Sequence, residues 1–160
     1  MTISCVSAND SVDNFTDSYD SNLTFDDSIV YNVHSSDEFL SLADTLATMI
    51  IQLGKNVTIN LDSGEVYAFN SGIKDKHLQN RIFDDYGFVM KADGYNLRIN
   101  GNGATIKNTD EYSLGFLYIN RDSTVALNNL TVCDFKLAFV NIGNCAVNSC
   151  NLLIMLMIIF

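Results

Sequence analysis

Two eight-residue stretches decide the fold: Val125-Ala126-Leu127-Asn128-Asn129-Leu130-Thr131-Val132 and Cys145-Ala146-Val147-Asn148-Ser149-Cys150-Asn151-Leu152. Their apolar positions are offset by a constant twenty residues. A looser copy lies upstream: Tyr95-Asn96-Leu97-Arg98-Ile99-Asn100-Gly101-Asn102-Gly103-Ala104-Thr105-Ile106. Short alternating strands with Asn or Gly corners and a period in the low twenties are typical of a solenoid.

A companion strand accompanies the repeat. The run Phe116-Leu117-Tyr118-Ile119 recurs as Phe139-Val140-Asn141-Ile142, twenty-three positions later. This recurrence matches Phe116 with Phe139 in the repeat. Asparagine tolerates the left-handed backbone better than other non-glycine residues. This tolerance predicts corners at the following asparagines: Asn100, Asn102, Asn128, Asn129 and Asn144.

Upstream of the repeats, the pattern predicts strands at residues 29–33, 57–61, 65–69 and 88–91, and a side loop at 71–85. Ser35 and Glu38 form a capping-box pattern, and apolar residues at helical spacing run as far as Gly54. A helix is therefore predicted at residues 37–53. Its apolar stripe is expected to cover the open end of the solenoid.

The two ends of the chain differ from its middle. Residues 1–8 resemble the end of a signal peptide, and the acidic, polar residues 9–28 predict a disordered leader. Residues 29–152 hold the cap and the first three or so rungs, and 153–160 form an apolar tail. We interpret the chain as a fragment of a longer exported protein. The alternatives are an ordinary cytoplasmic N-terminus and a tail buried against a partner or a second copy.

Charge narrows the range of partners. The chain has a net charge of −10, with 19 acidic and 9 basic residues. This balance argues against binding to nucleic acid or to an anionic membrane surface. The apolar tail is also too short for a membrane span, although it could support self-association.

The cysteine spacing does not favour a zinc site, because no CxxC pair occurs and no histidine is near. Cys145 and Cys150 occupy apolar repeat positions and are predicted to be core fillers, whereas Cys133 is expected to point outward. A disulfide among Cys133, Cys145 and Cys150 is the alternative for an exported protein.

The order of strand, capped helix, the run Val57-Thr58-Ile59-Asn60-Leu61 and the later repeats resembles the N-terminal end of right-handed parallel β-helix proteins of the pectate-lyase-like superfamily. Within that group the chain is most similar to the Asn-rich adhesin-like surface proteins of methanogenic archaea. The resemblance covers about residues 29–152. It implies an extracellular or cell-surface location and a role in adhesion.

The sequence predicts no catalytic residue, cofactor or metal site. Enzymes on the resembled fold use clustered carboxylates with a basic residue. The charged residues considered for such a site are Asp84, Asp85, Asp93, Asp110, Glu111, Asp122 and Asp134, with Lys91, Lys107, Arg98 and Arg121. No carboxylate recurs at one place in successive repeats, so these residues are interpreted as solvated loop charges. Candidate glycosylation sites are Asn14, Asn22, Asn56 and Asn129.

Two functions follow from these observations. The first is a non-catalytic, exported adhesin-like module that presents the loops at 71–85 and 108–113 to glycans or neighbouring cells. The second is a polysaccharide lyase or glycoside hydrolase whose catalytic rungs lie outside this chain. A cytoplasmic protein without an assignable role is the remaining alternative.

Overall fold

The computed structural model describes residues 27–48, 54–70, 87–109, 114–135, 137–141 and 143–153. These residues contain one α-helix and twelve β-strands. The first elements are β1 (Ile29–Val33), α1 (Ser36–Thr48), β2 (Asn56–Leu61) and β3 (Val66–Phe69). Three groups of three strands follow: β4 (Gly87–Ala92), β5 (Asn96–Asn100) and β6 (Thr105–Asn108); β7 (Leu114–Ile119), β8 (Thr124–Asn128) and β9 (Thr131–Cys133); β10 (Leu137–Asn141), β11 (Asn144–Asn148) and β12 (Asn151–Leu153).

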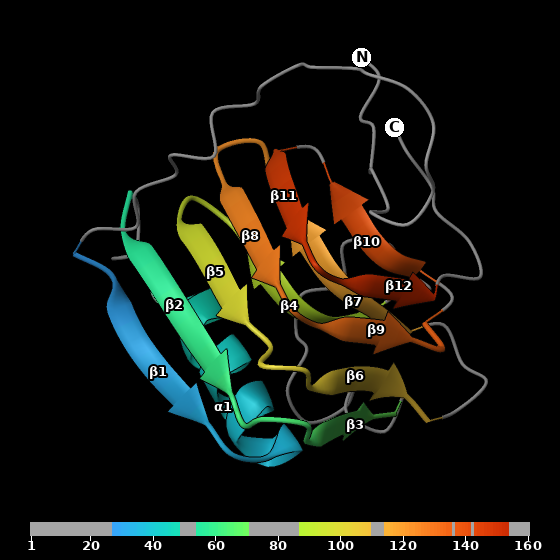
Figure 1. Cartoon of the computed structure of the whole chain (residues 1–160). Helices are drawn as coiled ribbons and strands as arrows, with labels where there is room; N and C mark the ends of the chain where they lie inside the picture. Colours follow the sequence, from blue (N-terminus) through green and yellow to red (C-terminus); the bar gives the residue numbers. More distant parts are fainter. Residues whose placement is uncertain are drawn as a thin grey trace, which may run out of the picture.

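The strands form three parallel sheets, and from β4 onward the chain visits them in rotation (Figure 1). The five-stranded sheet has the order β1-β2-β5-β8-β11, the four-stranded sheet β3-β6-β9-β12, and the three-stranded sheet β4-β7-β10. We call one pass of the chain through the three sheets a circuit. Neighbouring strands within each sheet come from successive circuits. The fold is therefore mainly β, with parallel sheets and a solenoid-like path.

Strand pairing confirms the twenty-residue offset. Cys145 pairs with Val125, Val147 with Leu127, and Leu152 with Val132. The apolar side chains of successive circuits consequently stack in rows. Val57, Leu97 and Val125 form one such row, and all three are fully buried.

The predicted offset of twenty-three for the companion strand is wrong by one residue. Phe139 pairs with Leu117, not with Phe116, so the offset is twenty-two. Phe116 and Phe139 still touch, edge to face, with ring centroids 5.8 Å apart. The aromatic rings meet on the diagonal between neighbouring strands, which the spacing of identical residues cannot indicate.

The helix covers one end of the core, as expected. Phe39, Leu40, Leu42, Ala43 and Leu46 are buried, and α1 packs against β4 and β3, each the terminal strand of its sheet. The helix begins as the capping pattern predicts, because Ser35 Oγ accepts the Glu38 N–H at 3.2 Å. It is described only to Thr48, and the remainder of the predicted 37–53 span lies outside the described residues.

The asparagines serve two purposes, of which only one was expected. Asn102 and Asn129 have left-handed φ values of 52° and 47°, as predicted for corners. Asn100, Asn128 and Asn144 lie within strands instead, so the corner interpretation is wrong for them. The side chains of Asn100 and Asn128 point outward and bond across strands.

The described cysteines carry free thiols. Cys145 and Cys150 pack against the core, as expected of apolar fillers. Cys133 alternates with the fully buried Val132 and is half-exposed, in line with the outward prediction. Burial raises the pKa of the Cys150 thiol and, with Asp134 adding to it, that of Cys133.

Several expectations concern residues outside the described ranges. They are the signal-peptide remnant at 1–8, the leader at 9–28 except for its last two residues, the loop at 71–85, residues 110–113 of the second loop, and the tail beyond Leu153. These expectations stay predictions.

Candidate functional site

The outward face of the five-stranded sheet carries an ordered polar array. Because side chains alternate along a strand, every second residue of β1, β2, β5, β8 and β11 points to this face. Strand pairing aligns them in three rows: Asn32, Asn60, Asn100, Asn128 and Asn148; Val30, Thr58, Arg98, Ala126 and Ala146; Asn56, Asn96, Thr124 and Asn144. We call this surface the asparagine face.

The first row forms a continuous ladder of amide hydrogen bonds. The Asn60 amide donates to Asn32 at 3.0 Å, and the Asn100 amide donates to Asn60 at 2.9 Å. The Asn128 amide donates to Asn100 at 3.1 Å, and Asn148 donates to Asn128 at 3.0 Å. All four bonds run from Nδ2 to the Oδ1 of the preceding circuit. The ladder therefore holds the amides in one orientation.

A second amide contact lies at the other end of the strands. Asn96 Nδ2 donates to Asn56 Oδ1 at 3.0 Å. In the ladder, Asn60, Asn100 and Asn128 each donate one N–H and accept one hydrogen bond. An asparagine side chain has two donors and an acceptor with two lone pairs, so the ladder bonds use half of this capacity. The face thus presents regularly spaced donors and acceptors to a ligand.

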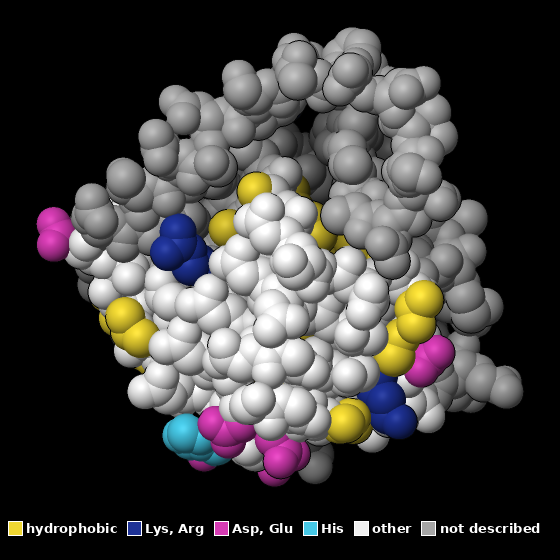
Figure 2. All heavy atoms as spheres, viewed as in Figure 1, with side chains coloured by type: hydrophobic (Ala, Val, Ile, Leu, Met, Phe, Trp, Pro, Cys, Tyr) yellow, Lys and Arg dark blue, Asp and Glu magenta, His cyan; other side chains and the backbone are white. Residues whose placement is uncertain are grey.

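Charge is almost absent from the asparagine face. Its three rows contain no aspartate or glutamate and one basic residue, Arg98, although the chain has 19 acidic residues. Figure 2 shows this side of the molecule, with acidic and histidine side chains at its lower rim and mostly uncharged groups across its centre. A neutral polar ligand therefore meets little electrostatic opposition here.

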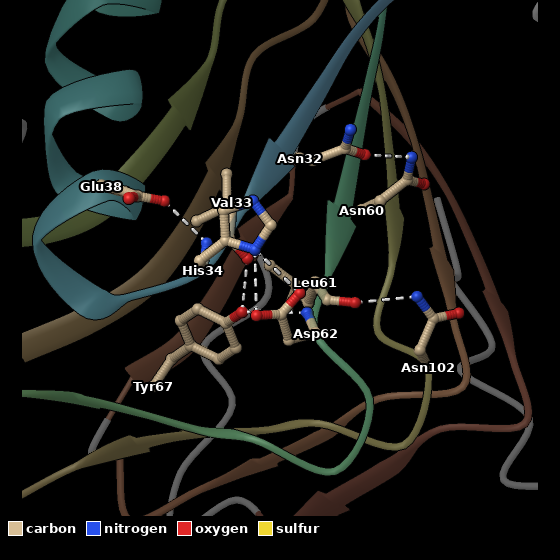
Figure 3. A network of polar contacts seen from close by, with 9 residues as sticks. All are labelled: Asn32, Val33, His34, Glu38, Asn60, Leu61, Asp62, Tyr67 and Asn102. Atoms are coloured by element: carbon tan, nitrogen blue, oxygen red, sulfur yellow. Dashed lines mark hydrogen bonds and ion pairs between the residues drawn. The ribbon is translucent and has the colours of Figure 1, made fainter.

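A polar cluster lies at the rim, where the chain leaves β1 and β2 (Figure 3). His34 Nδ1 is 3.0 Å from both carboxylate oxygens of Asp62, and the His34 backbone N–H donates to Glu38 at 2.7 Å. The Tyr67 hydroxyl donates to the Val33 carbonyl at 2.6 Å and accepts the Asp62 N–H at 3.0 Å. The cluster ties the start of α1 to the turn between β2 and β3.

The charges and hydrogen bonds of this cluster support a structural role, in which the start of α1 is held against the turn between β2 and β3. The hydrogen bond and charge of Asp62 raise the pKa of His34, and burial raises the pKa of the Tyr67 hydroxyl. The His34 ring is exposed and bonded to a carboxylate. In the described part of the chain no serine or cysteine is hydrogen-bonded to that ring. Among the described residues, the His34–Asp62 pair therefore has no partner that could act as the nucleophile of acyl-transfer chemistry.

The charged residues considered for catalysis are scattered where they are described. Lys91 Nζ lies 2.6 Å from Asp93, and the Asn120 amide bonds the same carboxylate. Lys91 first, and Asn120 second, hold the pKa of Asp93 below its usual value. The next circuit places Asn120, not a carboxylate, beside Asp93. Asp93 is thus a stable anion in a surface ion pair.

The other described candidates comprise three exposed residues and two half-buried residues. Asp122 and Arg121 are exposed in the turn after β7, and Asp134 is exposed in the corner after β9. Lys107 and Arg98 are half-buried strand residues. The other four, Asp84, Asp85, Asp110 and Glu111, lie outside the described residues. Among the described residues no group of three or more histidine, cysteine or acidic side chains could hold a metal ion.

The two described glycosylation candidates differ in setting. Asn129 is exposed at a corner, whereas the Asn56 side chain is half-buried and bonded to Asn96. Asn14 and Asn22 lie outside the described residues. Of the described helices, none has the length and apolar character needed to cross a membrane.

Sequence reasoning missed the asparagine ladder, although a signal for it was present. Asn128 and Asn148 are separated by the same twenty positions as the apolar repeat, and Asn60 and Asn100 precede equivalent turns. An asparagine that keeps the repeat offset indicates an amide stacked on its neighbour. The position of a corner asparagine depends on the length and type of its turn, so it need not keep the repeat offset.

The ladder yields a graded stability prediction. Asn100→Ala removes two amide bonds in a half-buried position, so we expect the free energy of unfolding to fall by about 1–3 kcal/mol. Asn148→Ala removes one bond at the exposed end, and its expected cost is about 1 kcal/mol or less. Urea denaturation of both variants measures the difference. Equal losses would show that the ladder adds nothing beyond single surface contacts.

Comparisons of the chain with protein-family models, with curated proteins and with solved structures found no match.

Proposed function

We propose that this chain is a non-catalytic, exported cell-surface module with an adhesin-like role, and that its asparagine face binds a neutral polysaccharide. The observation that carries the proposal is the ordered array of amides on a face without carboxylates in a protein of net charge −10. Export, surface attachment and an archaeal source rest on the family resemblance alone.

Amide chemistry supports a glycan as the ligand. Sugar hydroxyl groups both donate and accept, and a fixed asparagine side chain offers both functions. Neighbouring strands lie roughly 4.8 Å apart, so the amides recur at that interval along the sheet. This interval is close to the length of one sugar unit in an extended polysaccharide. A polymer lying across the strands would repeat its contacts with each circuit.

The lack of charge argues for a neutral polymer over an acidic one. Acidic groups such as Glu38 and Asp62 lie at the rim of the face, and the whole protein repels anions. A uronate polymer would approach against this field, with Arg98 as its one cationic contact on the face. A neutral chain has no such barrier.

We further propose that the three sheets form the start of a right-handed parallel β-helix. The rotation of the chain through three parallel sheets supports this, as does the right-handed rule for connections between parallel strands. Such a coil would make the asparagine face flat and stiff. A stiff array reduces the entropy lost when it binds an extended polymer.

The test is a binding measurement with a matched pair of variants. Thr124 on β8 belongs to the asparagine face, and Thr131 on β9 is an equally half-buried threonine in the four-stranded sheet. Thr124→Glu places a charged side chain beside the amide rows. A bound glycan would have to desolvate this charge, which costs binding free energy. Thr131→Glu is the control, since it adds the same charge elsewhere.

Affinity electrophoresis against cellulose, chitin and mannan derivatives, with polygalacturonate and alginate as acidic probes, reads out the result. We expect the unmodified chain to bind a neutral polymer, and Thr124→Glu to bind it roughly tenfold more weakly. Thr131→Glu should bind normally. Binding to none of the polymers, or equal weakening by both variants, would contradict the proposal. Release of unsaturated uronate products would favour the lyase alternative.

A further inference from the structure

Two asparagine–glycine pairs occur in the sequence, and both lie where the chain turns from β5 to β6. They are Asn100-Gly101 and Asn102-Gly103. Asparagine is a labile residue, and it is most labile before glycine, because the glycine nitrogen can approach the side-chain amide without hindrance from a Cβ atom. Both of these labile pairs are therefore held in one turn.

The reaction to which such a pair is prone is deamidation. The Gly101 nitrogen attacks Asn100 Cγ and forms a five-membered imide, as its proton passes to a base in the solvent. The bond from Cγ to Nδ2 breaks, and the amide nitrogen takes up a proton and leaves as ammonia. Water then opens the ring, at Cγ to give aspartate or at the backbone carbonyl carbon to give isoaspartate. Water is the only co-reactant.

The fold holds the first pair in an unreactive arrangement. Gly101 is buried, and its N–H donates to the Asn128 carbonyl at 2.8 Å. The Asn100 amide is bonded on both sides, since it donates to Asn60 at 2.9 Å and accepts from Asn128 at 3.1 Å. Attack would break the backbone bond and turn the side chain away from its ladder partners. The reaction at Asn100 therefore requires the stacked circuits to separate.

The second pair is more open to solvent and provides a comparison within the same chain. Asn102 and Gly103 are both exposed. The Asn102 amide donates to the Leu61 carbonyl at 2.8 Å (Figure 3), and the Gly103 N–H donates to the Asn129 carbonyl at 2.8 Å. Because the two dipeptides are identical, any difference between their rates in the folded chain reports the effect of the fold.

Neither product of deamidation at position 100 fits the native stacking. Aspartate lacks the N–H that Asn100 donates to Asn60, so two oxygen atoms would face each other at this step of the ladder. Isoaspartate adds one atom to the backbone before Gly101, where the corner has no spare room. A Cβ atom at Gly101 would already lie 2.5 Å from the Asn129 carbonyl oxygen. The modified turn would therefore hold the two circuits apart.

We propose that Asn100 is a self-modification site, at which deamidation is blocked by the stacked circuits and makes their opening permanent once it occurs. Local opening of a folded chain is ordinarily reversible. When β5 and β8 separate, however, the imide can form, and the loss of ammonia prevents the asparagine from returning. A brief opening is thereby converted into a lasting loss of stacking. The inference is independent of glycan binding.

Peptide mapping by mass spectrometry tests the block. The full chain is kept in mildly alkaline buffer, either folded or unfolded in urea, and the two pairs are followed over time. In urea we expect Asn100 and Asn102 to deamidate at similar rates. In the folded chain Asn100 should react roughly tenfold more slowly than Asn102, or more slowly still. The same ratio of rates in both conditions, or no reaction at Asn100 in urea, would overturn the proposal.

Refolding tests whether the change is permanent. After incubation in urea and dilution, size-exclusion chromatography separates the refolded from the unrecovered chains. Deamidated Asn100 should be concentrated in the unrecovered fraction, a result that needs no variant. Asn100→Gln keeps an amide but would need a less favourable six-membered ring, so its refolding yield should not decline with incubation time. Its matched control, Asn102→Gln, should decline as the unmodified chain does. An even distribution of deamidated Asn100, or equal declines in both variants, would refute the proposal.

Discussion

Phe39→Ala is expected to lower the free energy of unfolding by about 3–5 kcal/mol, the usual cost of truncating a fully buried aromatic side chain. The Phe39 ring lies between three others, with centroids 6.2 Å from Tyr67, 5.6 Å from Phe69 and 6.5 Å from Phe116. Its loss would leave a cavity where the helix meets the sheets. Because small domains have only about 5–15 kcal/mol of stability, this loss would remove a large share of the total.

Thermal and urea unfolding, followed by circular dichroism, measure this effect. Ser41→Ala is the control, because Ser41 is an exposed residue of the same helix. Its expected change is within about 0.5 kcal/mol. A loss below about 1 kcal/mol in Phe39→Ala would contradict the described packing of the helix on the core.

Gly101→Ala is expected to destabilise the chain by about 3 kcal/mol, because the corner of the next circuit leaves no room for a methyl group. A Cβ atom at Gly101 would lie 2.5 Å from the Asn129 carbonyl oxygen and 2.8 Å from the Leu130 Cβ atom. The Gly101 N–H also donates to the Asn128 carbonyl at 2.8 Å. The two corners would have to separate, which would strain this bond.

Gly103→Ala separates crowding from backbone strain. Gly103 has a φ of 81° and open space around its Cα atom, so its substitution introduces conformational strain without a clash. That strain costs about 1–2 kcal/mol. Urea denaturation should therefore rank Gly101→Ala as the more damaging change. The reverse ranking would contradict the close stacking of the corners.

Local signals predicted the elements well. The strand at residues 29–33 has the expected bounds, and Ser35 and Glu38 mark the start of the helix. The Glu38 carboxylate accepts the His34 N–H, whereas a capping box would bring it to the N–H of the N-cap, Ser35. This departure joins the cap to the His34–Asp62 pair. A spacing rule could not reveal it, because Asp62 lies 28 residues away.

Register and side-chain function were harder to predict from the sequence. The match of Phe116 with Phe139 predicts a strand register that differs by one residue from the observed register. The reason is that two aromatic rings pack on a diagonal as readily as side by side. The turn preference of asparagine predicts corners at Asn100 and Asn128. Both instead lie in strands, where the cross-strand amide bond competes with the turn preference.

By itself, the sequence determined the mainly β character, the twenty-residue stacking of Val125 with Cys145, and the apolar helix that covers one end. These features depend on alternation, periodicity and capping, which act over a few residues. Only the tertiary structure decided the aromatic register, the asparagine ladder and the neutral sheet face. Each of these depends on which strands become neighbours, and ladder partners such as Asn60 and Asn100 are 40 residues apart in the chain.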